Sequence, residues 1–465
     1  QVIRMVSDRY TEPDFDYVAW ENSEYLPTPT IVEAAQALYR GHNVHDITRS
    51  DAGAENLTVT TAEISRIIEY SKANHRKSIC FVTGVPGAGK TLVGLNLAIQ
   101  RSDAQRGEHA VFLSGNYPLV TVLQEALARD KVEQEKQRGN RVSKTDALRS
   151  TSAFIQIIHK YRDSFVGNDH IPPERIAIFD EAQRAWTHEM IEKFMRTKKG
   201  VAEFRYSEPE FLISTMDRHR DWAVIVCLVG GGQEINTGEA GLPEWFDSLR
   251  RAFPNWDVYI TPQLNDVEYR RERAWQDMIA DLNIFEHEKL HLATSVRSFR
   301  TPDLAAFVKA ILDVDTERAK ELYQRIKDKY PVRLTRDLNT AKKWAREQCQ
   351  GTTRYGMLAS SGALRLKPEG IFVKNEINVA NWLLNGKDDV RSSYYLEDVV
   401  SEFDIQGLEL DYSIVAWDAD FRFDGTEWTY YHFVGNRWQN VAAEERKLYL
   451  KNAYRVLLTR ARQGG

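Results

Sequence analysis

The sequence contains few cysteines and no long apolar run. Its 465 residues include three cysteines, Cys80, Cys227 and Cys349, which are far apart in the chain. Cys80 and Cys227 lie within apolar, strand-like segments, so we expect buried thiols, no disulfide and a reducing, cytoplasmic location. No segment approaches the roughly 18 to 20 uncharged apolar residues of a membrane span. We therefore expect no membrane partner.

A secretory signal and an excess of positive charge are also missing. The N-terminus has no basic segment followed by an apolar one, although the chain begins at Gln1, so we allow for a segment upstream. The formal net charge is −5, which argues against a globally basic nucleic-acid coat. A local basic groove is still compatible with this charge, because phosphate contacts need only a few Lys and Arg side chains.

What the chain does have is enough apolar sequence for more than one core. It is 42% hydrophobic and 28% charged, which predicts two or three domains. We predict an α/β protein with a short N-terminal lead-in over residues 1–57, a first domain over 58–287 and a second over 288–465. The lead-in should contain a helix from Ile31 to Tyr39, and the capping-box spacing from Thr60 to Glu63 predicts the start of the next helix.

The segment around which the first domain is organised is residues 79–98, ICFVTGVPGAGKTLVGLNLA. Residues 79–83 are typical of a buried parallel strand. Gly84, Gly87 and Gly89 fit the phosphate-binding loop pattern, in which backbone N–H groups point into one concavity at the start of a helix. The alternative is a glycine-rich turn without a ligand, but the flanking strand and helix favour nucleotide binding.

Lys90 and Thr91 complete this pattern. A lysine at this position reaches the β- and γ-phosphate oxygens of a nucleotide, and the threonine hydroxyl is a ligand for Mg²⁺. We therefore predict that this segment binds a nucleotide together with Mg²⁺.

A second apolar strand ends in two carboxylates, Asp180 and Glu181, in the segment IAIFDEAQ. In phosphate-loop NTPases the first acid holds Mg²⁺ and the second orients and deprotonates the attacking water. The pattern is weak alone, but downstream of a phosphate loop it predicts an NTPase. The strongest strand, residues 223–229, then leads to Gln233, which is placed to sense a γ-phosphate; a simple glycine turn is the alternative.

The remaining segments are less specific. Residues 110–113 predict a strand before a helix, and residues 129–149 carry few apolar side chains, which favours a mobile insert over a nucleic-acid contact. Residues 265–287 look like a helical exit from the first domain. The second domain should open with a strand near Leu290 and contain helices from about 303, 316, 339 and 443. It should also contain a strand in residues 356–362 and two strands within residues 399–421.

Taken together, seven motifs in order resemble those of a superfamily-1 helicase motor, and most closely the bacterial Schlafen-type DNA/RNA helicase domain family. They are GVPGAGKT, LSGNYPLV, FDEAQRAW, LVGGGQEINTGEAGLPEW, ATSVRSFR, FDIQGLELD and YRVLLTRAR. The resemblance covers about residue 60 to the end. It implies two RecA-like lobes with parallel sheets, with ATP and Mg²⁺ in the cleft between them and nucleic acid, single-stranded or duplex, crossing both lobes.

The resemblance also implies roles for individual residues. Gln233 becomes the glutamine of the third motif, Arg297 and Arg460 become γ-phosphate arginines, and Glu409 becomes an acid near the nucleotide. An upstream nuclease domain or a partner protein would be consistent with the family. The GGGQE form of the third motif departs from the GDxxQ form of many superfamily-1 motors, and the chain has no obvious long accessory domains.

We therefore expect an ATP-dependent nucleic-acid translocase or helicase. The alternative is an NTPase conformational switch that binds a protein partner without separating strands. The acidic net charge slightly favours the switch, whereas the two motifs LSGNYPLV and FDIQGLELD favour the motor.

Overall fold

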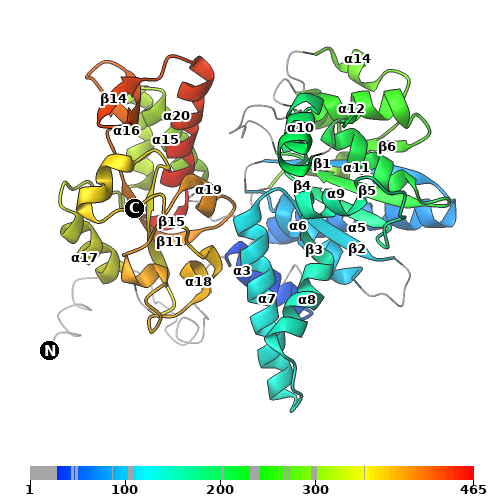
Figure 1. Ribbon diagram of the computed structural model, residues 1–465, viewed down its shortest axis with the longest axis horizontal. Coiled ribbons are helices and arrows are strands. Elements are labelled where there is room, and N and C mark those ends of the chain that lie inside the picture. The colour runs from blue at the N-terminus through cyan, green and yellow to red at the C-terminus, as the bar shows by residue number, and fades with distance from the viewer. Residues whose placement is uncertain are drawn as a thin grey trace, which may run out of the picture.

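Two α/β lobes lie side by side in the computed structural model (Figure 1). The structure describes residues 29–42, 47, 51–85, 87–102, 108–200, 204–230, 241–266, 269, 273–294, 301–349 and 351–465. Within these residues, no helix combines the length and apolar character needed to cross a membrane.

The first lobe is built on one parallel sheet with strand order β3-β2-β4-β5-β1-β6-β7, and β8 pairs with β1 beyond this path. The strands are β1 (Lys77–Gly84), β2 (Ala110–Ser114), β3 (Ile155–Ile157), β4 (Ile176–Asp180), β5 (Ala223–Leu228), β6 (Asp257–Ile260), β7 (Asn283–Glu286) and β8 (His291–Leu292). Every residue of β2, β4 and β5 is buried, as expected for parallel strands covered on both faces.

Helices cover both faces of this sheet, and successive residues of β1 enter opposite cores. Ile79 and Phe81 belong to one core, whereas Cys80 and Val82 belong to the other. The helices are α3 (Ile31–Tyr39), α5 (Asp51–Ala73), α6 (Lys90–Gln100), α7 (Tyr117–Gln137), α8 (Lys144–Phe154), α9 (Ile158–Phe165), α10 (His188–Phe194), α11 (Glu208–Asp217), α12 (Gly241–Ala252) and α14 (Trp275–Ile279).

Cys80 and Cys227 are buried free thiols, and burial raises the pKa of both.

The prediction of α3 is confirmed at both ends, whereas the predicted helix start at Thr60 is wrong. Helix α5 begins at Asp51, so Thr60 and Glu63 lie in its interior. Both side chains form other hydrogen bonds instead of a cap. The Thr60 hydroxyl donates to the Lys289 carbonyl oxygen at 2.8 Å, and Glu63 accepts a hydrogen bond from Arg66 at 2.6 Å.

Residues 129–149 form the far end of a helical hairpin, so the prediction of a mobile insert is wrong. Helix α7 continues to Gln137 and α8 starts at Lys144, and Figure 1 shows both extending beyond the sheet. The charges that suggested an insert pair with one another: Lys144 contacts Glu125 at 2.7 Å and Arg138 contacts Glu135 at 3.0 Å. Exposed helices tolerate such a composition because ion pairs along and between them replace apolar contacts.

The second lobe contains a smaller parallel sheet of order β10-β9-β11-β15 and a separate antiparallel sheet β12-β13-β14. Its strands are β9 (Tyr355–Ala359), β10 (Val399–Val400), β11 (Leu410–Ala416), β12 (Phe421–Phe423), β13 (Trp428–Val434), β14 (Arg437–Asn440) and β15 (Ala461–Gly464). Its helices are α15 (Thr301–Leu312), α16 (Thr316–Ile326), α17 (Leu338–Gln348), α18 (Val379–Leu384), α19 (Glu402–Ile405) and α20 (Glu444–Leu458).

The strand expected at the start of the second lobe belongs to the first sheet. In β8, His291 and Leu292 pair with Thr83 and Gly84 of β1, so the first sheet extends past residue 287. The segment 265–287, expected to be helical, instead contains the short helix α14 and the strand β7.

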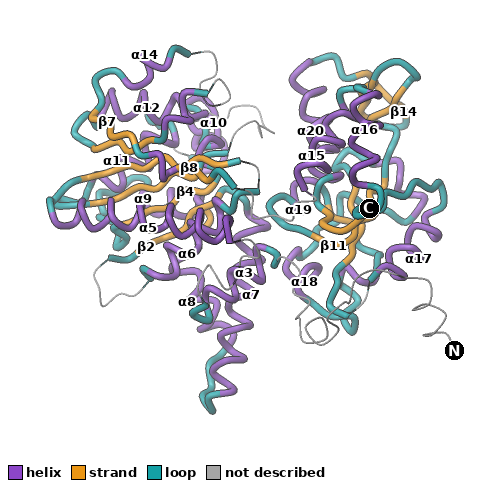
Figure 2. The backbone as a smooth tube through the Cα atoms, turned by 180° about the vertical axis from the view of Figure 1, so that it is seen from behind, coloured by secondary structure: helices purple, strands orange, loops and turns teal. Residues whose placement is uncertain are grey.

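The two lobes touch along α7. Helices α18 and α19 of the second lobe both pack against α7 of the first, and Figure 2 shows α3, α7 and α18 close to the junction. Arg129 of α7 donates to the Asn385 side-chain oxygen at 2.8 Å. Leu119, Ile405 and Leu408 belong to one apolar cluster, so the hydrophobic core is continuous across the junction.

Candidate functional site

The phosphate-loop segment joins the end of β1 to the start of α6. Gly87 and Gly89 have φ values of 76° and 85°, in the left-handed region that residues with a Cβ rarely adopt. Gly89 is the N-cap of α6, which begins at Lys90. The backbone therefore turns sharply just before a helix N-terminus, where N–H groups and the helix dipole favour an anion.

Strand β8 supports this loop from the side. A Cβ on Gly84 would lie 2.7 Å from the Leu292 Cβ, and the Val85 N–H donates to the Leu292 carbonyl oxygen at 3.1 Å. His291 lies 2.8 Å from the Thr83 hydroxyl through its Nδ1, and burial, with a smaller effect of nearby Lys90, lowers its pKa. A strand near Leu290 was predicted, but its pairing with β1 was not, because the paired residues lie 208 positions apart in the sequence.

Thr91 and Asp180 are brought together by the sheet order β4-β5-β1, which places the carboxyl ends of β1 and β4 at one edge. The Thr91 hydroxyl donates to the Asp180 carboxylate, with Oγ1 to Oδ1 and Oδ2 distances of 3.2 and 3.4 Å. Lys90 Nζ donates to the Gly84 carbonyl oxygen at 2.8 Å, so its ammonium group folds back over the loop.

Asp180 is buried, and burial, together with the negative charge of Glu181, raises its pKa to about 7. A carboxylate and a hydroxyl are the oxygen ligands that Mg²⁺ prefers. A cation between them would also offset the cost of keeping a buried carboxylate ionised. The donor set therefore fits Mg²⁺.

Glu181 is held in an unusual conformation. Its φ of 54° is left-handed, and its carboxylate accepts a hydrogen bond from the Gln183 side-chain amide. The Gln183 oxygen in turn accepts from the Gly230 N–H at 2.9 Å. Gln183 thus ties the end of β4 to the end of β5. Strained backbone that is fixed by its neighbours is common at functional sites.

Two predicted site residues, Gln233 and Arg297, lie outside the described residues. The other two residues predicted from the second lobe are close together. The Leu410 N–H, directly after Glu409, donates to the Arg460 carbonyl oxygen at 3.1 Å. Arg460 lies just after α20, and its Nε donates to the Val456 carbonyl oxygen at 3.1 Å.

One loop, residues 406–409, connects these residues to the first lobe. Asn116 donates from Nδ2 to the Gln406 backbone carbonyl oxygen at 2.7 Å. With its amide oxygen facing Arg184, Gln406 also accepts hydrogen bonds from that guanidinium group, one of them at 2.9 Å. Arg184 ends the short 3₁₀ helix Ala182–Arg184 that follows Glu181. Contact between the lobes is therefore made three residues from Glu181.

Asn116, Gln183, Arg184 and Gln406 were not singled out from the sequence. All four lie within the quoted motifs, so the motifs did mark the segments in which these residues are found. Their partners could not be identified, because the contact between Asn116 and Gln406 spans 290 positions.

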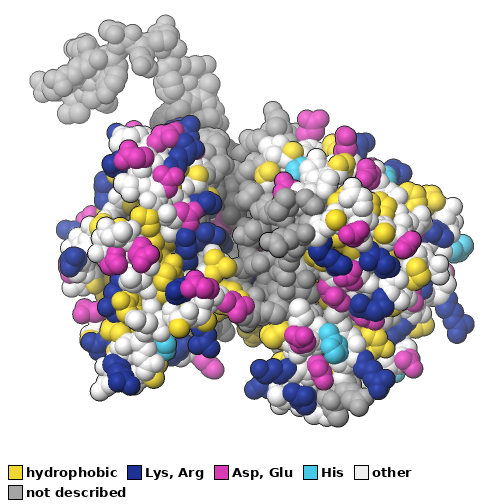
Figure 3. All heavy atoms as spheres, turned by 90° about the horizontal axis from the view of Figure 1, so that it is seen from above, with side chains coloured by type: hydrophobic (Ala, Val, Ile, Leu, Met, Phe, Trp, Pro, Cys, Tyr) yellow, Lys and Arg dark blue, Asp and Glu magenta, His cyan; other side chains and the backbone are white. Residues whose placement is uncertain are grey.

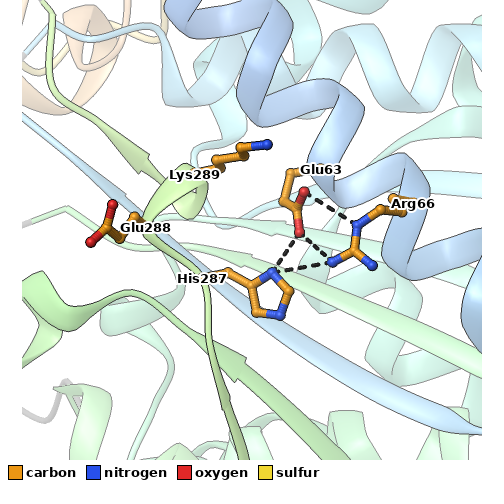
Figure 4. Close-up of a pocket in the computed structure, with 5 residues that line it drawn as sticks. All are labelled: Glu63, Arg66, His287, Glu288 and Lys289. Carbon is orange, nitrogen blue, oxygen red and sulfur yellow. Dashed lines mark hydrogen bonds and ion pairs between the residues drawn. The ribbon is translucent and has the colours of Figure 1, made fainter.

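A separate surface depression of about 420 Å³ lies against α5 and the segment between β7 and β8. Glu63, Arg66, His287, Glu288 and Lys289 line it (Figure 4). Figure 4 shows Glu63 between Arg66 and His287, and its hydrogen bond from Arg66 is the largest factor that lowers its pKa. Since Glu63, Arg66 and His287 satisfy one another through hydrogen bonds, we interpret the depression as structural.

Comparisons with known proteins agree with the arrangement of motifs. The family "Schlafen group 3, DNA/RNA helicase domain" matches residues 77–465. The chain therefore belongs to this family and is a helicase-type domain with two α/β lobes.

A solved structure titled "Crystal structure of Pyrococcus furiosus Hef helicase domain" is similar over 76% of this chain and 89% of that one. The sequence identity is 13% and the TM-score is 0.26, too low to support an argument. The comparison with curated proteins gives no match.

Proposed function

We propose that this chain binds ATP with Mg²⁺ between its lobes, hydrolyses it, and uses the resulting changes in lobe contact to translocate along DNA or RNA or to separate its strands. Membership of a DNA/RNA helicase family supports the nucleic-acid part of the proposal. The contact between Thr91 and Asp180 supports the ATP part, because it joins the two motifs that phosphoryl transfer requires.

In this proposal the first lobe holds the nucleotide. The loop containing Gly84, Gly87 and Gly89 surrounds the phosphates, and Lys90 leaves the Gly84 carbonyl to neutralise the β- and γ-phosphate oxygens. Thr91 and Asp180 would hold Mg²⁺, which supplies positive charge against the phosphates.

Glu181 is the proposed general base. Its carboxylate accepts a proton from the attacking water, and the Gln183 amide keeps that carboxylate in place. Gln233, which follows β5, is proposed to sense the γ-phosphate. The hydrogen bond between Gln183 and Gly230 provides a physical link between the base and the Gln233 segment.

The second lobe is proposed to supply Arg460 and Arg297 to the γ-phosphate and Glu409 to the nucleotide environment. The observation that carries this part is the contact of Gln406 with both Asn116 and Arg184. A loop that touches the first lobe next to the proposed base and also lies beside Arg460 can transmit the nucleotide state between lobes.

Steady-state ATP hydrolysis with and without single-stranded DNA or RNA tests this function. We expect a basal rate that rises on addition of nucleic acid, and loss of both rates in Lys90→Ala. Hydrolysis that no nucleic acid changes would contradict the motor and favour an NTPase switch acting on a protein partner.

A further inference from the structure

The antiparallel sheet β12-β13-β14 carries two different faces. Because strand residues alternate and β12 pairs with β13 in the register Phe421↔Tyr430 and Phe423↔Trp428, these four aromatic residues share one face. Phe421 stacks on Trp428 with ring centroids 4.3 Å apart. Trp428 Nε1 donates to the Ile311 carbonyl oxygen of α15 at 3.1 Å, so this face packs toward the body of the lobe.

The opposite face carries Arg422, Tyr431, Phe433 and Trp438. The Arg422 guanidinium carbon lies 4.1 Å from the Tyr431 ring centroid and 4.8 Å from that of Trp438. Phe433 meets Trp438 edge-on, with centroids 5.2 Å apart and an interplanar angle of 70°. Arg365 is an exposed residue of the 3₁₀ helix Leu364–Glu369 that follows β9, and its guanidinium carbon lies 5.2 Å from the Phe433 ring centroid. Arginine and aromatic side chains therefore alternate across this face.

These groups are accessible. Tyr431, Phe433 and Trp438 are partly exposed although they are large and aromatic. In Figure 1, β14 lies at the top of the second lobe. Accessible apolar groups beside charged side chains are a feature of binding surfaces.

The positive charges on this face also differ from others in the lobe. Arg391 pairs with Asp389 at 2.7 Å, and Arg462 pairs with Asp411 at 2.6 Å. Within the described part of the chain, Arg365 and Arg422 form no ion pair with a carboxylate, and Arg422 donates instead from Nε to the Ala419 carbonyl oxygen. The Nη2 of Arg422 is moreover a buried donor without a hydrogen-bond acceptor in the described residues.

We propose that this face, defined by Arg365, Arg422, Tyr431, Phe433 and Trp438, binds single-stranded nucleic acid. Bases would stack on the partly exposed rings, and a backbone phosphate would neutralise Arg365, which is exposed and has no carboxylate partner. Stacking is tolerant of sequence, since every base has a π-face. The site would therefore bind strands without a strong sequence preference.

The position of the face in the fold supports this assignment. Strand β12 follows the carboxyl end of β11, and the segment with Arg365 follows the carboxyl end of β9. Asp420, which follows β11, joins these two ends, because it accepts a hydrogen bond at 2.8 Å from Ser360, directly after β9. Ligands of open α/β sheets gather at the carboxyl ends of their strands.

Charge alone would not have identified this face. Seen from above, Lys and Arg side chains are interspersed with Asp and Glu over both lobes (Figure 3). The combination of arginines without carboxylate partners and accessible rings is what indicates a nucleic acid. An acidic protein segment would satisfy the arginines without needing the rings.

The inference rests on the proposed function and can fail separately from it. The test measures binding of fluorescein-labelled dT15 and rU15 by anisotropy for the parent and for Trp438→Ala and Arg365→Glu. We expect Trp438→Ala to weaken binding about tenfold, within the range for loss of one stacked base. Arg365→Glu should weaken binding and lower the slope of log affinity against log salt concentration, because a phosphate contact is lost.

The matched control is Phe423→Ala, which removes an aromatic side chain that is 48% exposed from the opposite face of the same sheet. We expect its affinity to stay within about twofold of the parent. Equal weakening by Phe423→Ala and Trp438→Ala, or unchanged binding in both Trp438→Ala and Arg365→Glu, would overturn the proposal. Basal ATP hydrolysis measured in the same variants should match the parent, whereas failure of the proposed function would appear as unstimulated hydrolysis in the parent itself.

Discussion

Asn116 Nδ2 donates to the Gln406 backbone carbonyl oxygen at 2.7 Å, across 290 positions of sequence. The same side chain caps α7, since its Oδ1 accepts from the Leu119 N–H at 3.2 Å. One residue therefore both starts a helix of the first lobe and holds a loop of the second. A change in the distance between the lobes must break or form this hydrogen bond.

The two roles of Asn116 can be separated by mutation. Asn116→Ser keeps an N-cap oxygen but removes the donor that reaches Gln406, whereas Asn116→Ala removes both. We expect Asn116→Ala to lower the free energy of unfolding by about 1 kcal/mol more than Asn116→Ser does, because the cap is lost. Both variants should lose nucleic-acid stimulation of ATP hydrolysis to a similar extent. Chemical denaturation and ATPase rates check this; full stimulation in Asn116→Ser would show that the contact is not coupled to turnover.

The proposed base is tested by Glu181→Gln. Glutamine keeps the shape and can still accept from Gln183, but it cannot take a proton from water. We expect ATP and Mg²⁺ to bind with nearly parental affinity while turnover falls by about 10² to 10⁴. Lys90→Ala should instead weaken nucleotide binding. Isothermal titration with ATP and Mg²⁺ distinguishes them, and an equal loss of affinity in the two variants would contradict the separate roles.

Arg460→Ala tests whether the second lobe takes part in hydrolysis. An arginine that acts on transition-state charge contributes about 10³ to 10⁵ in rate, whereas an exposed ion pair contributes about 0 to 1 kcal/mol of stability. We expect stimulated hydrolysis to be lost while the fold and ADP affinity persist. Arg446→Ala, at an exposed position of helix α20, which ends just before Arg460, is the control. A rate within a few-fold of the parent would make Arg460 structural.

Asp420 predicts a pH dependence of stability. Burial raises the pKa of its carboxyl group to about 6 in the folded protein, from about 4 in an unfolded chain. The folded state therefore holds this proton more tightly, and between about pH 4 and pH 6 the free energy of unfolding falls as pH rises.

The comparison with Asp420→Asn isolates this effect. Relative to that variant, the parent should lose on the order of 1 to 3 kcal/mol of stability between pH 4 and pH 7. Urea denaturation at both pH values measures it. A stability difference that does not change with pH would show that the folded carboxyl titrates normally.

The local patterns in the sequence predicted much of the fold and of the nucleotide site. The segments of β1, β2, β4 and β5 were predicted from short apolar runs, and the contact of Thr91 with Asp180 follows from their order in a parallel sheet. These features depend on neighbours in sequence or on a general rule of α/β folds. These strands and this contact can therefore be predicted from patterns in the sequence.

Features that depend on distant partners were missed. In the pairing of β8 with β1, each residue of β8 lies 208 positions after its partner in β1, so no local pattern predicts the pairing. The prediction that a helix starts at Thr60 was wrong, because the Thr60 hydroxyl bonds to the Lys289 carbonyl oxygen instead of capping a helix. The antiparallel sheet β12-β13-β14 did have a signal, since Gly435-Asn436 between Val434 and Arg437 is a two-residue hairpin loop.

The central claim is that the bound nucleotide changes the affinity of the two lobes for a nucleic-acid strand. It is tested most directly by measuring that affinity in different nucleotide states. The affinity of Glu181→Gln for a single-stranded oligonucleotide should be measured with Mg²⁺ and saturating ATP, with Mg²⁺ and ADP, and without nucleotide. Linkage energies of about 1 to 3 kcal/mol are typical of coupled sites. We therefore predict that ATP and ADP change the affinity by different factors, at least about fivefold apart. Identical oligonucleotide affinities in all three states would contradict the account.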